Sequence, residues 1–179
     1  MKKARFSIGI LFFICGLNFA TWATRIPDFK SFLGLSDAQL GTVLMGLPIG
    51  SLVSLPIAGW LLTKYASRWI CLMAIAMYVL VIPGLSLMSS PITLFVGLFF
   101  FGMAGDIMNI AMNTQVVSLE AKMNKIIMSS FHAVFSIGLM AGAFLGGILE
   151  KEHFTTTEHF SLVALSNILL IPSIIFLVV

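Results

Sequence analysis

Charged residues are scarce in this sequence. Only 9% of its 179 residues are Asp, Glu, Lys or Arg, against about a quarter in an ordinary soluble domain. Hydrophobic residues make up 59%. A water-soluble globular domain needs a more polar surface than this composition supplies, so the scarcity of charge excludes that class and favours a protein surrounded by lipid.

Motifs for covalent chemistry are also missing. The two cysteines, Cys15 and Cys71, lie within apolar stretches, which favours small packed side chains over a disulfide or redox pair. The sequence contains no Ser/His/Asp spacing, zinc motif, phosphate-binding loop or dinucleotide fingerprint. We therefore expect no enzyme activity, no cofactor and no metal. A group of acidic and histidine residues fits a solvated loop better than a metal site: Glu150, Glu152, His153, Glu158 and His159.

What the sequence does contain is six long apolar stretches. A membrane-spanning helix needs roughly 20 mostly apolar residues, and the stretches occupy about 6–24, 38–62, 69–88, 91–119, 126–149 and 160–179. They predict an all-α, polytopic membrane protein that forms a single domain over residues 1–179. Ser36 and Gln39 have the spacing of a helix-capping box, Pro27 should end the first helix, and Pro91 should begin the fourth.

The orientation in the bilayer is predicted by the cationic residues, which are enriched on the cytoplasmic side of membrane proteins. With the N-terminus in the cytoplasm, one side holds Lys2, Lys3, Arg5, Lys64, Arg68, Lys122 and Lys125, and the other holds Arg25, Lys30 and Lys151. Seven against three favours this orientation. The net charge of +3 then reflects topology, and we expect no nucleic-acid partner.

A weak internal repeat relates the two halves of the sequence. A shift of 88 residues places Ile49-Gly50 on Ile137-Gly138 and Asn18 on Asp106, and a shift of 89 places Pro83 on Pro172. Each repeat holds three spans, so the second copy must enter the membrane from the opposite side. Inverted repeats of this kind are typical of secondary transporters. The alternative is chance similarity between glycine-rich spans.

Two rows of polar side chains occupy equivalent helices of the two repeats. Asp106, Asn109 and Asn113 in the fourth span, and Asn18, Thr21 and Arg25 in the first, each follow an i, i+3, i+7 spacing that gathers them on one helical face. We expect both rows to line one aqueous path. Hydrogen bonding between helices is the alternative for Asn18 and Asn113.

Asp106 is the strongest functional candidate. It lies near the bilayer centre, where a carboxylate costs at least about 2.5 kcal/mol, so it must face protein or a water-filled cavity. Apolar surroundings favour the neutral form of a carboxyl group, which makes Asp106 a candidate for binding and releasing a proton. The alternative is a structural acid that is hydrogen-bonded to a neighbour.

Three further side chains have two interpretations each. Arg25 fits the outer mouth of a path or a side chain that reaches the headgroups. Trp22 fits stacking on a sugar-like ring or anchoring at the membrane interface. His132 fits packing in the bundle or a proton relay in the cavity. The glycines at 50, 59, 138, 142, 146 and 147 fit close contact between helices or homodimerisation.

Four stretches together resemble a known family: GLNFATWATRIPDFK, LGLSDAQLG, the Asp106-x-x-Asn109-x-x-x-Asn113 run, and SSFHAVFSIG. They are similar to the N-terminal six-helix half of major facilitator superfamily transporters, in a bacterial inner-membrane branch related to fucose permeases. The resemblance implies proton-coupled transport of a small polar solute, such as a sugar, by alternating access. It also implies that Asp106 is the proton-coupling carboxylate of the fourth helix.

The resemblance extends in part to the gating loop between the second and third helices. In the family this loop reads roughly G-x-x-x-D-[RK]-x-G-[RK]. Here Gly59, Lys64 and Arg68 match, whereas Thr63 replaces the acid and Ala66 replaces the second glycine. The family's latch between the two halves of the transporter is therefore incomplete in this sequence.

Members of the family have about twelve helices, and the sequence supplies six. The second half is absent from it, so we expect this bundle to act with a second six-helix half or as a homodimer. The alternative is a truncated or inactive membrane protein.

Overall fold

The computed structural model describes residues 1–174, and this part of the chain consists of helices joined by short turns, with no strand. The all-α prediction is confirmed. The helices are α1 Lys2–Thr24, α2 Ile26–Phe32, α3 Asp37–Leu44, α4 Gly46–Lys64, α5 Ser67–Leu85, α6 Pro91–Met123, α7 Met128–Lys151 and α8 Thr156–Leu170, followed by the 3-10 helix η1 Ile171–Ile174.

These elements form six spans that are long and apolar enough to cross a membrane. α1 with α2, α3 with α4, and α8 with η1 each form one span, and α5, α6 and α7 form one each. The fourth span extends to Met123 and the sixth begins at Thr156. Residues 175–179 of the sixth predicted stretch lie outside the described residues.

Local sequence signals set several helix ends. The Ser36 hydroxyl accepts a hydrogen bond from the Gln39 amide, and the Gln39 side chain accepts one from the Ser36 amide, so the predicted capping box begins α3. Pro27 has a different role from the predicted one. It lies in the first turn of the short helix α2, where its missing N–H costs nothing, and the break after α1 falls at Arg25.

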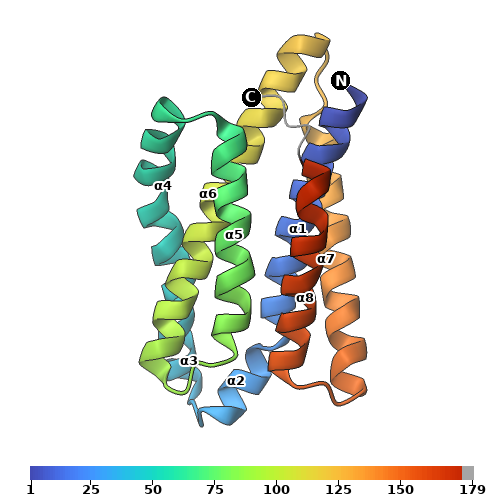
Figure 1. Ribbon diagram of the computed structural model, residues 1–179. Coiled ribbons are helices and arrows are strands. Elements are labelled where there is room, and N and C mark those ends of the chain that lie inside the picture. Colours follow the sequence, from blue (N-terminus) through green and yellow to red (C-terminus); the bar gives the residue numbers. More distant parts are fainter. Residues whose placement is uncertain (175–179) are drawn as a thin grey trace.

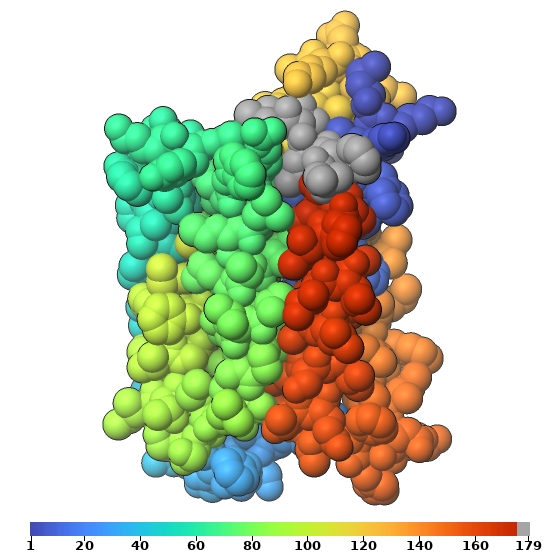
Figure 2. All heavy atoms as spheres, in the orientation of Figure 1, coloured from blue at the N-terminus to red at the C-terminus, as the bar shows by residue number. Residues whose placement is uncertain are grey.

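The two repeats run in opposite directions through the bundle (Figure 1). α1, α5 and α7 descend in the view of Figure 1, whereas α4, α6 and α8 ascend. α1 packs along α7, and α4 packs along α6. In the repeat α1 corresponds to α6, and α4 corresponds to α7. The α1–α7 pair is therefore equivalent to the α4–α6 pair, as an inverted repeat requires. α5 and α8 lie side by side on the front face, which the space-filling view shows as closely filled (Figure 2).

Glycines bring the helices of both pairs into contact. Gly16 and Gly138 lie between α1 and α7, and Gly50 and Gly102 lie between α4 and α6. A β-carbon at any of these positions would overlap a backbone carbonyl oxygen of the facing helix, that of Phe135, Phe13, Phe99 or Leu47 respectively. Because the repeat relates Gly50 to Gly138, the same contact occurs once in each helix pair.

The small residues that make these contacts recur every fourth position. In α4 the buried residues are Gly46, Gly50, Ser54 and Ala58, and in α7 they include Gly138, Gly142 and Gly146. The prediction that Gly59 and Gly147 also make close contacts is wrong. A β-carbon at either would meet no atom within 4 Å, because both lie one residue outside the four-residue stripe.

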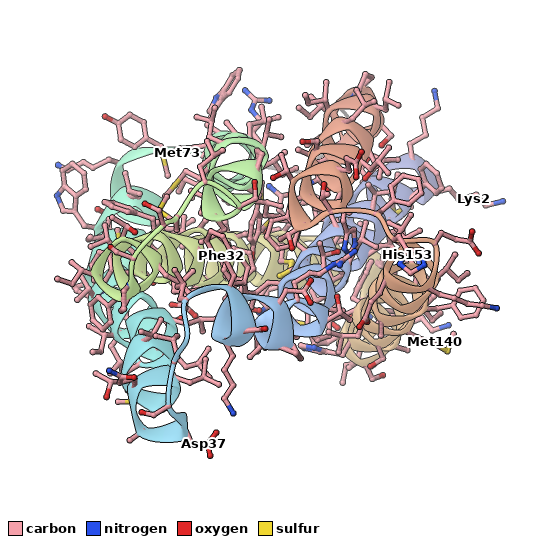
Figure 3. All side chains as sticks on the ribbon, turned by 90° about the horizontal axis from the view of Figure 1, so that it is seen from below. Lys2, Phe32, Asp37, Met73, Met140 and His153 are labelled. Carbon is pink, nitrogen blue, oxygen red and sulfur yellow. The ribbon has the colours of Figure 1, made fainter. Side chains whose placement is uncertain are left out.

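The outer surface is apolar along the membrane-length helices. Exposed side chains include Leu52, Trp60, Leu80 and Phe144, which are between 57% and 73% exposed. Seen from below in Figure 3, side chains such as Met73 and Met140 project away from the bundle on opposite sides. The cationic residues assigned to the cytoplasm lie at the end that holds the N-terminus, the α4–α5 turn and the α6–α7 turn. Which side of a membrane this end faces stays a prediction.

Candidate functional site

A cavity of about 370 Å³ lies between the α1–α7 pair and the α4–α6 pair, with α5 behind it. Aromatic and aliphatic side chains form most of its wall, and a small number of polar groups are exposed to it. The polar or ionisable lining residues are Cys15, Ser51, Tyr78, Asp106, Asn109 and His132. An apolar pocket of this size with a few convergent polar groups is typical of a small-molecule site.

Asp106 lies at the middle of the 33-residue helix α6 and faces this cavity. Its Oδ2 accepts a hydrogen bond of 2.9 Å from the hydroxyl of Ser54, which is completely buried on α4. The same hydroxyl lies 2.6 Å from the carbonyl oxygen of Ser51. Since a hydroxyl carries one hydrogen, Ser54 can donate to only one of these two acceptors at a time.

Asn109 and Asn113 continue the row along α6. Asn109 lines the cavity, and its Oδ1 accepts a hydrogen bond of 3.1 Å from Nδ2 of Asn113. Asn113 is not part of the lining, and its Oδ1 is buried with no hydrogen-bond partner among the described residues. The structure therefore brings Asp106 and Asn109 to one cavity and places Asn113 behind them.

His132 reaches the cavity from the opposite helix pair. Glu120 at the end of α6 accepts hydrogen bonds from the amides of Ile127 and Met128, which fixes the start of α7 and places His132 one turn into it. The imidazole is exposed and stands edge-on to Phe12, with 5.4 Å between ring centroids. Of the two interpretations, this position fits a cavity-lining residue.

The first-helix row does not line this cavity. Asn18 and Thr21 are completely buried, and Asn18 Oδ1 accepts a hydrogen bond of 2.9 Å from Asn167 on α8. The expectation of one path shared by both rows is therefore not met. The α1 row points toward α8, so hydrogen bonding between helices describes Asn18.

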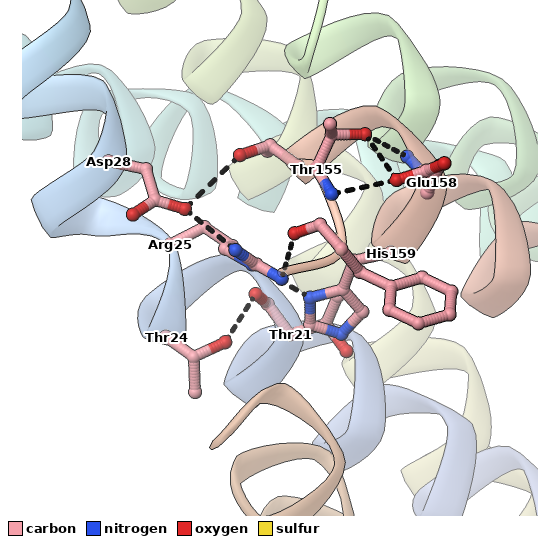
Figure 4. A network of polar contacts seen from close by, with 9 residues as sticks. Thr21, Thr24, Arg25, Asp28, Thr155, Glu158 and His159 are labelled. Carbon is pink, nitrogen blue, oxygen red and sulfur yellow. Dashed lines mark hydrogen bonds and ion pairs between the residues drawn. The ribbon is translucent and has the colours of Figure 1, made fainter. Parts of the chain in front are cut away.

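Arg25 forms the centre of a polar network between α1, α2 and α8 (Figure 4). Its Nε donates to Nδ1 of His159 at 3.1 Å, one terminal nitrogen donates to Asp28 at 2.9 Å, and the other donates to the Phe154 carbonyl at 3.1 Å. Thr156 also donates to Asp28. Arg25 is only 3% exposed, so the expectation that it reaches the headgroups is wrong. His159 is completely buried, so it does not belong to a solvated loop.

Trp22 is also interior. It is 3% exposed, and its ring lies 5.2 Å from that of Phe29 and 6.5 Å from that of Phe101. Anchoring at the membrane interface is therefore excluded for Trp22, and its ring is not among those that line the cavity. It packs α1 against α2 and α6.

The proposed gating residues do not line the cavity: Gly59 lies within α4, and Lys64 and Arg68 lie on either side of the α4–α5 turn. Gly59, Lys64 and Arg68 are exposed, and the Arg68 guanidinium stacks on Trp69 at 5.2 Å from the ring centre. Within residues 1–174, no group of three His, Cys, Asp or Glu side chains is placed to hold a metal ion.

Sequence reasoning missed several side chains of these networks, and three of them show what signal was available. Ser54 carried a readable signal, because it belongs to the stripe of small residues on α4 and any polar member of that stripe must face α6. Asn167 is a polar residue inside an apolar span, the same signal that singled out Asn18. Ser51 had no such signal, since it lies beside the stripe.

Comparison with known proteins gives consistent results. The sequence profile of the Major Facilitator Superfamily matches residues 8–179. An uncharacterized MFS-type transporter of Yersinia pestis is 41% identical over 142 residues, which cover 79% of this chain and 36% of that protein. An uncharacterized transporter of Sinorhizobium fredii is 31% identical over 87% of this chain and 41% of its own length. Membrane protein MosC of Rhizobium meliloti is 28% identical over 95% of this chain and 41% of its own length.

Among solved structures, the nucleoside transporter NupG has the same fold. The two align with a TM-score of 0.78 and 16% sequence identity, over 100% of this chain and 45% of NupG. The chain therefore spans less than half the length of the relatives that it matches.

Proposed function

The chain belongs to the major facilitator superfamily, and from this premise we propose that it is the N-terminal half of a proton-coupled secondary transporter for a small polar solute. The family indicates transport rather than catalysis. We place the protein in the bacterial inner membrane with its N-terminus in the cytoplasm, as the distribution of Lys and Arg favours. The solute class includes sugars and other hydroxyl-rich molecules.

The observation that carries the proposal is the position of Asp106. Burying an ionisable group at the centre of a membrane-spanning helix costs free energy, so a group found there usually has a function. Asp106 faces a cavity of about 370 Å³, and among the described residues its side chain has one hydrogen-bond partner, the Ser54 hydroxyl. Asn109 and His132 add hydrogen-bonding groups that can bind hydroxyls of a solute, and aromatic rings such as Phe101 supply apolar contact.

The hydroxyl of Ser54 suits both protonation states of Asp106. When the carboxyl group is charged, Ser54 donates to it, as the 2.9 Å distance allows. When the carboxyl group is protonated, it donates to Ser54, and Ser54 donates to the Ser51 carbonyl at 2.6 Å. Binding a proton then reverses a hydrogen-bond chain between α6 and α4 and leaves no buried donor unsatisfied. This links the proton to the pair of helices that forms the cavity wall.

Alternating access would be a rocking motion of this bundle against a second one. The glycine contacts within each helix pair keep the pairs rigid, so the motion falls between bundles. The second bundle is either the other half of the same transporter, a separate chain or a second copy. The exposed Lys64 and Arg68 at the α4–α5 turn are candidates to contact it in one gating state.

The test is solute-driven proton movement in vesicles. The complete gene product is reconstituted into proteoliposomes that contain a pH-sensitive dye, and a panel of sugars and nucleosides is added in turn. We expect at least one solute to acidify the lumen and Asp106→Asn to abolish the signal, because an amide keeps the hydrogen bond from Ser54 but carries no exchangeable acid proton. Asp37→Asn is the matched control, since that carboxylate is 92% exposed at the start of α3.

An Asp106→Asn protein that still couples proton entry to solute would overturn the proton-coupling role. Retention of solute exchange without proton movement would support it further. If none of the sugars and nucleosides is transported and no proton enters the vesicles, the alternative of an inactive membrane protein gains support.

A further inference from the structure

A second cavity has a different chemistry from the one that holds Asp106. It has a volume of about 550 Å³, lies between the first half of α1 and the first turns of α7, and shares no lining residue with the Asp106 cavity. Lys2, Arg5 and Ser130 form its polar end, and the rest of its wall is apolar, with Ile10, Phe13 and Val134. One end of the cavity is therefore cationic, and the other end is apolar.

The polar end can bind a phosphate group. Lys2 and Arg5 are exposed, and Lys2 projects away from the bundle in Figure 3. Arg5 lies 3.5 Å from the Ser130 hydroxyl, which holds its guanidinium beside the α7 end of the cavity. The nearby Glu120 accepts hydrogen bonds from the first amides of α7, so its charge is already engaged by that helix end. Lys2 and Arg5 are the two cations that line this end, and the Ser130 hydroxyl, which donates to the Ile127 carbonyl at 2.6 Å, positions Arg5. Rotation of the long, exposed Lys2 side chain brings its ammonium group to the cavity.

The apolar end has the dimensions of one acyl chain in one leaflet. Lys2 and Phe13 are eleven residues apart on α1, which is roughly 16 Å along a helix at about 1.5 Å per residue. Half of a bilayer's hydrocarbon core is about 15 Å thick. At the middle of this path, Gly9 leaves open space, since a β-carbon there would meet no atom within 4 Å.

We propose that this cavity binds an anionic phospholipid, with the phosphate on Lys2 and Arg5, and one acyl chain along Gly9, Ile10 and Phe13. Basic pockets between membrane-spanning helices recognise acidic headgroups in this way. The charge matches the headgroup, the depth matches the chain, and the cavity lies away from the transport site. The lipid would hold the ends of α1 and α7 together while the whole bundle rocks against its partner.

The experiment measures thermal unfolding of the complete gene product in neutral detergent micelles supplemented with palmitoyl-oleoyl phosphatidylglycerol, and counts retained lipids by native mass spectrometry. We expect a rise of several degrees in the unfolding temperature and one retained phosphatidylglycerol, because a ligand that binds only the folded state stabilises it. Phosphatidylcholine and glycerol 3-phosphate are the comparison additives. They test the headgroup charge and the acyl chain separately.

Two variants remove one half of the site each. Lys2→Gln with Arg5→Gln should weaken phosphatidylglycerol binding by about fivefold per cation, which corresponds to about 1 kcal/mol for each. Gly9→Leu should fill the acyl path, leave both cations in place and still abolish the retained lipid. The matched controls are Lys122→Gln with Lys125→Gln, at the same end but outside the lining, and Gly147→Leu, at another open position.

Three outcomes would overturn the proposal. Equal stabilisation by phosphatidylcholine would show that the cavity does not distinguish an anionic headgroup from a zwitterionic one. Stabilisation by glycerol 3-phosphate alone would indicate a site for free phosphate esters. Equal loss of binding in the Lys122 and Lys125 control would show general attraction to a positive surface rather than a site.

Discussion

The polar rows of the two repeats have opposite surroundings. On α1, Asn18 and Thr21 are completely buried and face α8, whereas on α6, Asp106 and Asn109 face an open cavity. The α1 row ends in the network of Arg25, which is closed by His159 and Asp28. The α6 row has one partner on another helix, Ser54.

The helix that packs against each row explains the difference. The 89-residue shift that aligns Pro83 with Pro172 also aligns Tyr78 on α5 with Asn167 on α8. Asn167 is an amide and forms a hydrogen bond with Asn18. The hydroxyl of Tyr78 instead approaches Cys15 at 4.0 Å and leaves the Asp106 carboxyl group free to face the cavity. The polar row of the first repeat therefore forms a structural joint, a set of hydrogen bonds that connects α1 to α8. The polar row of the second repeat forms the candidate site.

Arg25→Met gives the largest expected effect on stability. The substitution removes the three hydrogen bonds of the buried guanidinium, to His159, Asp28 and the Phe154 carbonyl, and at about 1 kcal/mol for each we expect a loss of about 3 kcal/mol. Thermal unfolding in detergent measures the loss. Asp106→Asn should change stability by less than about 1 kcal/mol, because its cavity is open and its hydrogen bond is kept. Equal losses in the two variants would contradict the division into joint and site, and Arg68→Met on the exposed turn is the control.

Gly50→Val tests whether the pairs of helices are as tightly packed as the shared glycine contacts indicate. A side chain at Gly50 overlaps the Phe99 carbonyl, so we expect a loss of about 2 kcal/mol from overpacking and a lower unfolding temperature. Gly59→Val is the matched control, because its β-carbon enters open space. If the two variants unfold at the same temperature, the stripe of small residues is not the contact surface.

Ser54→Ala sharpens the comparison at the site. Its hydroxyl is the hydrogen-bond partner of the Asp106 carboxyl group on α4, and a hydrogen bond to a charged group contributes about 1.5–3 kcal/mol. Without it, Asp106 is no longer linked to α4, so we expect the rate of proton-coupled uptake to fall by about tenfold. The measurement is initial uptake into proteoliposomes. An unchanged rate would mean that this hydrogen bond plays no part in coupling.

The smallest effect is expected from the Asn18–Asn167 pair. Either single Leu substitution should cost about 0.6 kcal/mol, the average for a hydrogen bond between membrane helices. The double variant should recover most of that loss, since it replaces both partners and leaves no unpaired amide. A double-mutant cycle of unfolding free energies measures this coupling. Transport should be unaffected, and a loss of transport with normal stability would place Asn18 in the path after all.

Much of this architecture could be predicted from the sequence. Six apolar runs give six spans because a helix is the structure that satisfies its own backbone in lipid, and the capping box at Ser36 begins α3 because its partners are local. Asp106 could be singled out since a carboxylate in an apolar run must have a polar neighbour. The repeat predicted the inverted arrangement of the two triplets, and its equivalent glycines, Gly50 and Gly138, make equivalent contacts.

The direction of each polar row could not be predicted in the same way. Periodicity states that Asn18, Thr21 and Arg25 share a face of their helix, but it does not state which helix that face meets. Arg25 illustrates the limit, since its partners His159 and Phe154 lie more than 120 residues away in the chain. Ser54 illustrates it again, because its hydroxyl matters only once α4 lies against α6.

Hydropathy and local spacing are enough to predict a helical membrane protein with two inverted triplets and one central carboxyl group. They do not predict that the α1 row is buried against α8 while the α6 row faces a cavity, which depends on how the helices pack. The physical reason is that burial and hydrogen bonding are properties of pairs of helices, and the rotation of each helix about its axis is set by the contacts of small residues on its neighbours.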